Sequence, residues 1–203
     1  MSDGTVFIVD DDEAIRDALT WLLQSRGVAA RAFDSAEDFL ANWTPDMAGC
    51  LLLDIRMSGM SGLDLFDRLR QVQSCIPVIF LTGHGDVPMA VGALKRGALD
   101  FVEKPFNDND LVDRIIDALE KDAQRRAAAS EVAGVAARLS QLTARERQVM
   151  DLVLAGKLNK VIADELGITM RTVEVHRAHV FEKMGVKTAV ELAQVLSAYK
   201  VER

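Results

Sequence analysis

Residues 1–122 alternate between short apolar runs of strand length and longer segments with helical spacing. The expected strands are 6–10, 29–33, 50–54, 77–81 and 99–103, and the expected helices are 13–26, a short one from Ser35, 62–72, 87–96 and 108–122. Five successive strand–helix units predict an α/β fold with a five-stranded, doubly wound parallel sheet and right-handed crossovers.

Four of these apolar runs end in a polar residue followed by a turn signal. The first run ends at Asp10-Asp11, the third at Asp54, the fourth at Thr82 and the fifth at Lys104. Because the carboxyl ends of parallel strands share one edge of a sheet, we expect these side chains to lie together where the strand order reverses. Three carboxylates, a hydroxyl and an ammonium are the groups needed to move a phosphoryl group with a metal ion.

The chemistry of Mg²⁺ (or Mn²⁺) suggests a role for each of these residues. Mg²⁺ usually takes one or two protein carboxylates and leaves its other positions to water and phosphate. Asp11 and Asp54 are the expected ligands, with Asp10 acting directly or through water. Asp54, at the tip of its strand, is the candidate nucleophile that forms an aspartyl-phosphate. Lys104 would neutralise the phosphoryl charge, and the Thr82 hydroxyl would donate to a phosphoryl oxygen.

Taken singly, these residues have ordinary structural interpretations. An acidic residue after a strand often caps the next helix, and we expect Asp12 to do so. A lysine before a proline is usually solvated, and most peptide bonds before proline are trans, so Lys104–Pro105 alone does not indicate a cis bond. The joint occurrence of all four strand endings favours the phosphoryl site.

Charge divides the chain into two parts. Residues 1–122 carry 22 acidic and 11 basic side chains, whereas residues 123–203 carry 9 acidic and 13 basic ones. An acidic front and a basic rear suggest two domains, of which the rear one can approach a polyanion. The Ala-rich, charged segment 121–137 is expected to be a helical extension or a semi-rigid linker.

The sequence gives no sign of a membrane protein or a secreted one. No apolar stretch approaches the ~18 residues that cross a bilayer, and residues 1–4 lack the features of a signal peptide. We therefore expect a cytoplasmic protein without a membrane partner. Cys50 and Cys75 lie beside expected strands, where buried free thiols are favoured over a disulfide or a metal pair.

The rear of the chain has only helical patterns. A capping box from Thr143 to Glu146 begins a helix that Gly156 ends, and further helices are expected at 159–166, 170–184 and 189–200. The second and third of these are joined by three residues, Gly167-Ile168-Thr169, which is the spacing of a helix-turn-helix. We therefore expect a small, all-α, four-helix domain.

The helix expected at 170–184 has a core stripe of Val173, Val180 and Met184. Its other faces can enter a major groove, although a solvated helix face is the alternative for each residue alone. The candidates for phosphate contact are Lys160, Arg171, Thr172, Arg177 and Lys183, and those for base edges are Glu174 for cytosine N4 and Val175 and Ala178 for a thymine methyl.

The strand-end motifs resemble the receiver domain of two-component response regulators over residues 4–120. The segments Leu81–Ala90 (LTGHGDVPMA) and Phe101–Phe106 (FVEKPF) are similar to the FixJ-type branch. The resemblance implies that Asp54 takes a phosphoryl group from a sensor histidine kinase.

The same resemblance implies several residue roles. Asp10 and Asp11 would hold Mg²⁺ together with the backbone carbonyl of Arg56. Thr82 would follow the phosphoryl group, and Phe101 would swing inward after it.

Two further features come from this likeness. In the family, the peptide bond before Pro105 is cis and Lys104 contacts the phosphoryl group. The family usually has proline where this chain has Ser58. Serine at this position loses the φ angle that proline fixes and gains a backbone N–H donor. We therefore expect a more mobile loop but the same chemistry.

The rear domain, expected at 138–203, resembles LuxR-type DNA-binding domains over about residues 138–200. The similarity lies in the segments 142–149, 159–163 and 171–177, with Met170 as a mild departure. It implies that the helix at 170–184 enters the groove of double-stranded promoter DNA.

Together these features predict a transcription factor controlled by phosphorylation, with RNA polymerase as a further partner. The expected switch is a homodimer through the face 87–122, and release of a contact between the domains is the alternative. A haloacid-dehalogenase-type phosphatase is a rival, but it needs an acid where Arg56 stands. A rear domain that binds RNA or protein is a third hypothesis.

Overall fold

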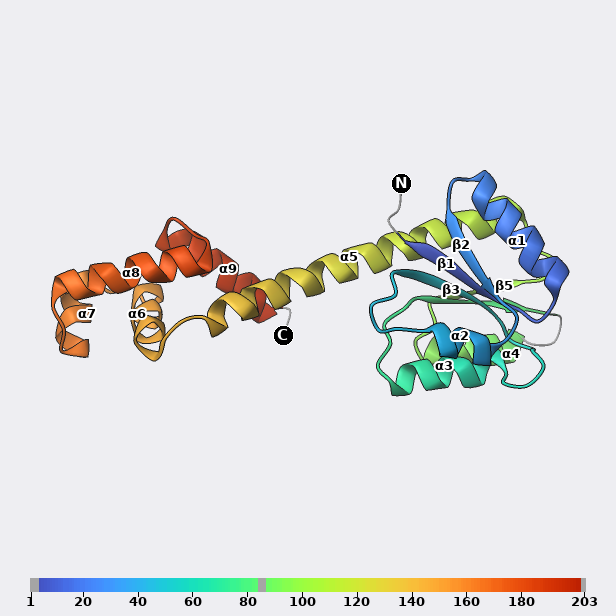
Figure 1. The fold of residues 1–203 in the computed structure, drawn as a ribbon, viewed down its shortest axis with the longest axis horizontal. Helices are drawn as coiled ribbons and strands as arrows, with labels where there is room; N and C mark the ends of the chain where they lie inside the picture. Colours follow the sequence, from blue (N-terminus) through green and yellow to red (C-terminus); the bar gives the residue numbers. More distant parts are fainter. Residues whose placement is uncertain (1–3, 84–86, 202–203) are drawn as a thin grey trace. The chain divides into compact units, whose positions relative to one another are not determined.

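The computed structural model describes residues 4–83 and 87–201, which form five strands and nine helices (Figure 1). The chain divides into two compact units after Arg126. No helix within the described ranges is long and apolar enough to span a membrane.

The first unit holds β1 (Thr5–Val9), α1 (Glu13–Ser25), β2 (Ala29–Phe33), α2 (Ala36–Asn42), β3 (Gly49–Asp54), α3 (Gly62–Gln71), β4 (Val78–Thr82), α4 (Val87–Lys95), β5 (Asp100–Glu103) and the beginning of α5 (Asp108–Ser140). The second holds the end of α5, α6 (Ala144–Leu154), α7 (Asn159–Leu166), α8 (Met170–Met184) and α9 (Ala189–Val201).

The five strands pair in parallel in the order β2-β1-β3-β4-β5. The order reverses at β1, because the chain runs outward to β2 and then returns to β3. The predicted five-stranded, doubly wound parallel sheet is therefore confirmed. Asp54 is in register with Leu81, and Thr82 is in register with Glu103, so the ends of β3, β4 and β5 lie along one edge.

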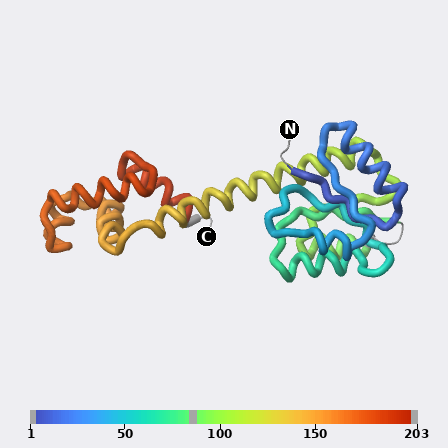
Figure 2. Tube along the Cα trace, in the orientation of Figure 1, coloured from blue at the N-terminus to red at the C-terminus, as the bar shows by residue number. Residues whose placement is uncertain are grey.

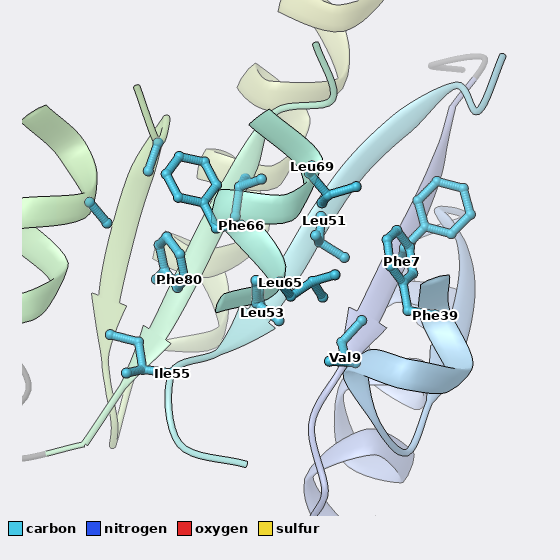
Figure 3. Close-up of a cluster of buried hydrophobic side chains, with 14 of the residues drawn as sticks. Phe7, Val9, Phe39, Leu51, Leu53, Ile55, Leu65, Phe66, Leu69 and Phe80 are labelled. Atoms are coloured by element: carbon cyan, nitrogen blue, oxygen red, sulfur yellow. The ribbon is translucent and has the colours of Figure 1, made fainter. Parts of the chain in front are cut away.

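Alternate strand residues bury into two apolar clusters, one on each face of the sheet. The helices α1 and α5 cover one face through residues such as Leu23 and Leu111, and α2, α3 and α4 cover the other (Figure 1). On that second face Phe66 meets Phe80 edge to face, with ring centroids 5.5 Å apart (Figure 3). This burial fixes each strand and leaves its polar end at the edge of the core.

Capping residues set where several helices of the first unit begin. The side chains of Asp12, Ser35 and Ser61 each accept a hydrogen bond from a backbone N–H in the first turn of the following helix. The expected capping role of Asp12 is confirmed.

The helix α5 runs without a break through the expected linker, 121–137. Near the start of this segment the Asp122 carboxylate, whose side chain is 0% exposed, ties the helix to the first unit. It accepts a hydrogen bond from Gly49 N at 2.9 Å and pairs with Arg125 and Arg126 at 2.6 and 2.7 Å. The domain boundaries expected at 120 and 138 both fall inside this helix and stay predictions.

The second unit contains the expected helix-turn-helix, formed by α7 and α8 (Figure 2). Gly167 ends α7 with a φ of 64°, a left-handed conformation that glycine adopts without strain. The Thr169 side chain then caps α8 by accepting a hydrogen bond from the backbone N–H of Thr172 in the first turn of the helix. The predicted core stripe of Val173, Val180 and Met184 is buried in the unit.

Both cysteines are free, as expected. Cys50 is buried in β3, and this burial raises the pKa of its thiol to about 12. Cys75 is exposed, so the expectation that it would be buried was wrong. The reason is that β4 begins only at Val78, which places Cys75 in the connection after α3.

Candidate functional site

Asp10, Asp54 and Lys104 meet at the carboxyl edge of the sheet. Asp10 follows β1, Asp54 ends β3 and Lys104 follows β5. The Lys104 ammonium donates to Asp10 Oδ2 and to Asp54 Oδ1, each at 2.8 Å. Both carboxylates are buried, Asp10 being 1% and Asp54 7% exposed. The strand order thus brings together three of the predicted side chains, with one cation between two buried acids.

Burial governs the protonation of these groups. It raises the pKa of Asp54, and the nearby Asp10 charge acts in the same direction, while the hydrogen bond and charge of Lys104 oppose it. Burial lowers the pKa of Lys104, but its hydrogen bonds to Asp10 and Asp54 outweigh that effect and the net pKa is raised. The shifts in pKa therefore favour the ammonium form of Lys104 and disfavour the ionised form of Asp54 relative to a solvated carboxylate.

Thr82 ends β4, the strand between β3 and β5, and is 0% exposed. Its backbone carbonyl accepts a hydrogen bond from Lys104 N at 2.7 Å. Its Oγ1 is buried and has no hydrogen-bond partner within residues 4–83 and 87–201. A buried hydroxyl without a hydrogen-bond partner destabilises the folded state unless a ligand binds it. A phosphoryl oxygen is a suitable acceptor for this hydroxyl.

Asp11 is exposed and contacts the loop between β3 and α3. Its Oδ2 accepts hydrogen bonds from the backbone N–H of Ser58 at 2.8 Å and from the Ser58 hydroxyl at 3.0 Å. The first of these bonds is the main reason that the pKa of Asp11 is lowered. Across the described residues, no three His, Cys, Asp or Glu side chains are grouped to hold a metal ion. Asp11 is thus the exposed member of the three predicted carboxylates, and its Oδ2 is bonded to this loop.

Arg56 contacts Asp54 through its backbone, and Phe101 lies in the edge strand β5. The backbone N–H of Arg56 donates to Asp54 Oδ2 at 2.9 Å, and the role of its carbonyl as a metal ligand stays a prediction. Phe101 in β5 is half-buried and lines a cavity of about 390 Å³ together with Phe106. Within the segment Leu81–Ala90, residues 84–86 lie outside the described residues.

The groups at this edge fit a divalent cation. Their donors are carboxylate oxygens, which Mg²⁺ prefers. The Lys104 ammonium already lies between Asp10 and Asp54, which shows that a positive charge is favoured there. Asp10, Asp11 and Asp54 with the Arg56 carbonyl are the groups that would hold the ion.

The predicted DNA contacts on α7 and α8 fall into two groups. Thr172, Arg177 and Lys183 are partly buried. The other five are exposed, as a surface that meets DNA requires. These exposed residues are Lys160, Arg171, Glu174, Val175 and Ala178.

The partly buried candidates already have partners inside the second unit. Arg177 donates to Asn159 Oδ1 at 2.6 Å, and its guanidinium lies 5.6 Å from the centroid of the Phe181 ring. Lys183 donates to Glu146 Oε2 at 2.7 Å and to the Gln141 carbonyl at 3.2 Å. These two cations hold helices together, so any contact with DNA would compete with that role.

Glu146 is a structural residue whose full role the sequence did not reveal. The structure has the capping box expected from the sequence, but Glu146 is also 3% exposed and paired with Lys183. The hydrogen bond from Lys183, followed by that from Thr143 N, lowers the pKa of Glu146 to about 2. Lys183 lies 37 residues further along the chain, so sequence spacing gave no signal of the pair.

Two family models match the chain. A response regulator receiver domain matches residues 6–116, and the model of bacterial regulatory proteins of the luxR family matches residues 140–196.

Known proteins match across almost the whole length. The C4-dicarboxylate transport transcriptional regulatory protein DctR of Rhodobacter capsulatus is 52% identical over 193 residues, which cover 94% of this chain and 98% of that protein. The transcriptional regulatory protein FixJ of Rhizobium meliloti (strain 1021) is 46% identical, with 98% and 97% covered. A solved structure of the response regulator StyR has a TM-score of 0.92 at 43% identity, with 96% and 98% covered.

Proposed function

The chain belongs to the response regulators that join a receiver domain to a LuxR-type DNA-binding domain, and from this we propose that Asp54 is the phosphoryl acceptor that controls DNA binding. The observation that carries this proposal is the buried Asp54 carboxylate, bound by Lys104 at 2.8 Å beside a strand that ends in Thr82, whose hydroxyl has no partner among the described residues. A sensor histidine kinase is the proposed phosphoryl donor.

In the proposed reaction an Asp54 carboxylate oxygen forms a bond to phosphorus while the bond from phosphorus to the donor's nitrogen or oxygen breaks. Lys104 neutralises charge on the phosphoryl oxygens, and the Thr82 Oγ1 hydroxyl donates to one of them. Asp10, Asp11, Asp54 and the Arg56 carbonyl would hold Mg²⁺, which would supply further neutralisation of charge. Arg56 N remains on the second Asp54 oxygen and orients the carboxylate.

The proposed switch begins when Thr82 moves onto the phosphoryl group and Phe101 follows. Phe101 is half-buried, and a cavity lies beside it. We propose that the altered face, 87–122, pairs two receivers as a homodimer, and release of an interdomain contact is the alternative.

Duplex promoter DNA is the proposed ligand of the second unit, through exposed residues of α7 and α8. Arg171 and Lys160 would contact phosphates, while Glu174, Val175 and Ala178 would meet base edges. We propose that the bound protein acts on RNA polymerase and works in the cytoplasm. A metabolic phosphatase role is disfavoured because Arg56 stands where that chemistry needs an acid.

A gel shift on genomic DNA fragments tests this function, with and without acetyl phosphate plus Mg²⁺. We expect sequence-selective binding that phosphorylation strengthens in wild type, whereas Asp54→Asn shows no response. Asp46→Asn, an exposed loop carboxylate, serves as the matched control and should respond like wild type. Binding that is indifferent to acetyl phosphate and to Asp54 would contradict the switch.

A further inference from the structure

The contact between Ser58 and Asp11 has no part in the chemistry described above. Ser58 lies in the loop between β3 and α3, and both of its donors bind the same oxygen, Asp11 Oδ2. The loop is also held from α2, because Glu37 Oε1 accepts a hydrogen bond from Met60 N at 3.1 Å. The loop is therefore tied at two points to carboxylates of neighbouring elements.

The Ser58 bonds commit Asp11 to the loop. Hydrogen bonds to an ionised carboxylate are stronger than those between neutral groups, and two of them fix its orientation. Asp10 and Asp54 meanwhile gather around Lys104, and no cluster of three acids suited to a metal exists among residues 4–83 and 87–201. A cation that takes Asp11 Oδ2 as a ligand therefore competes with the two Ser58 donors for that oxygen.

We propose that Ser58 is a positioning residue that competes with a divalent cation for Asp11 Oδ2, so that cation binding and release of the loop 57–61 are one coupled event. This inference rests on the proposed Mg²⁺ site. Coupling between two equilibria is reciprocal, so the Ser58 bonds weaken Mg²⁺ binding to the same degree that Mg²⁺ weakens those bonds.

The chemistry of position 58 offers a graded test. Ser58→Ala removes the hydroxyl but keeps the N–H donor, whereas Ser58→Pro removes both. Ser61→Ala is the matched control in the same loop. The Ser61 hydroxyl bonds to Asp64 at the start of α3, and it is not a partner of Asp11.

The measurement is the Mg²⁺ dissociation constant of the unphosphorylated full chain, determined by isothermal titration calorimetry. We expect the dissociation constant to fall about threefold in Ser58→Ala and about tenfold in Ser58→Pro, because each lost bond to the carboxylate removes part of the competition. Ser61→Ala should bind Mg²⁺ like wild type. In wild type, hydrogen exchange in the peptide that covers 57–61 should speed up when Mg²⁺ is added.

The outcomes separate the two proposals. If wild type binds Mg²⁺ but Ser58→Ala binds it equally or more weakly, or if Ser61→Ala matches Ser58→Ala, the coupling is overturned and the metal site stands. If wild type binds no Mg²⁺, or Asp54→Asn leaves binding unchanged, the metal site fails and the coupling fails with it. Thermal melts check folding, and Ser58→Ala alone decides the question if the proline variant does not fold.

Discussion

At the edge of the sheet, Asp10 and Asp54 are buried around Lys104, whereas on α8 the cationic Arg171 is exposed to solvent. The first region gathers charge where water is excluded and leaves Thr82 Oγ1 without a partner among the described residues. The second region spreads its charge over a helix surface, and Lys183 in that region is already paired within the fold.

The difference in burial between the sheet edge and α8 bears on the function of each region. Burial makes charges interact strongly, so a cluster of buried polar groups with an unpartnered hydroxyl is retained for chemistry more often than for stability. An exposed cation costs little and can serve as solvated surface or as a contact for phosphate. On α8 the distinction comes from the surroundings of each cation: Lys183 is paired with Glu146 within the unit, and Arg171 is exposed, as its proposed contact with DNA requires.

The largest effect is expected from Lys104, the cation at the buried site. Lys104→Met preserves side-chain length but removes the charge that stabilises the phosphoryl group, so phosphorylation by acetyl phosphate should slow about 100-fold. The rate can be followed by intact mass spectrometry of the full chain. Lys121→Met, at an exposed position of α5, should leave the rate unchanged. A Lys104→Met rate within threefold of wild type would remove the distinction between the two regions.

The sheet edge could be predicted because strand order decides it. Once the apolar runs are parallel strands, Asp54 and Thr82 must end on the same edge, and the register leaves little freedom. The core stripe through Val173 and Val180 was predictable for a similar reason, since helical periodicity determines which side is buried.

Side-chain choices made by loops and by distant helices could not be predicted. The two hydrogen bonds from Ser58 to Asp11 come from a loop whose path no periodicity specifies. Lys183 pairs with Glu146 of another helix, a contact that the sequence did not indicate, and its phosphate contact stays a prediction. Both contacts depend on tertiary packing between residues far apart in the sequence.

The next effect concerns the stability of the second unit. Glu146→Gln removes the charge that Lys183 pairs with inside the fold, and it should lower the free energy of unfolding of this unit by about 1–3 kcal/mol. Hydrogen exchange of amides in α6 and α8 of the full chain measures this. Glu165→Gln is the matched control, because its pair with Lys157 is exposed and should contribute less than about 1 kcal/mol. Equal effects would mean that burial does not distinguish these pairs.

The same residue predicts a pH dependence. Its pKa is lowered from 4.5 to about 2 in the folded state, so the unfolded chain binds the proton more readily. The stabilisation from Glu146 is therefore fully present above pH 4.5 and is lost as the pH falls towards 2. The difference in stability between wild type and Glu146→Gln should shrink over that interval, and a difference that stays constant would contradict the assignment.

The smallest expected effect is on DNA affinity, and it distinguishes Arg171 from Lys183. Arg171→Ala should weaken binding roughly tenfold and reduce the slope of log affinity against log salt by about one, as expected for one lost phosphate contact. Lys183→Ala should leave the salt slope unchanged but destabilise the second unit, because Glu146 loses its cation. Fluorescence anisotropy over a salt series measures the slope for both variants. If Lys183→Ala also lowered the slope by one, its pairing with Glu146 would have to open when DNA binds, and exposure alone would no longer separate the binding cations from the structural ones.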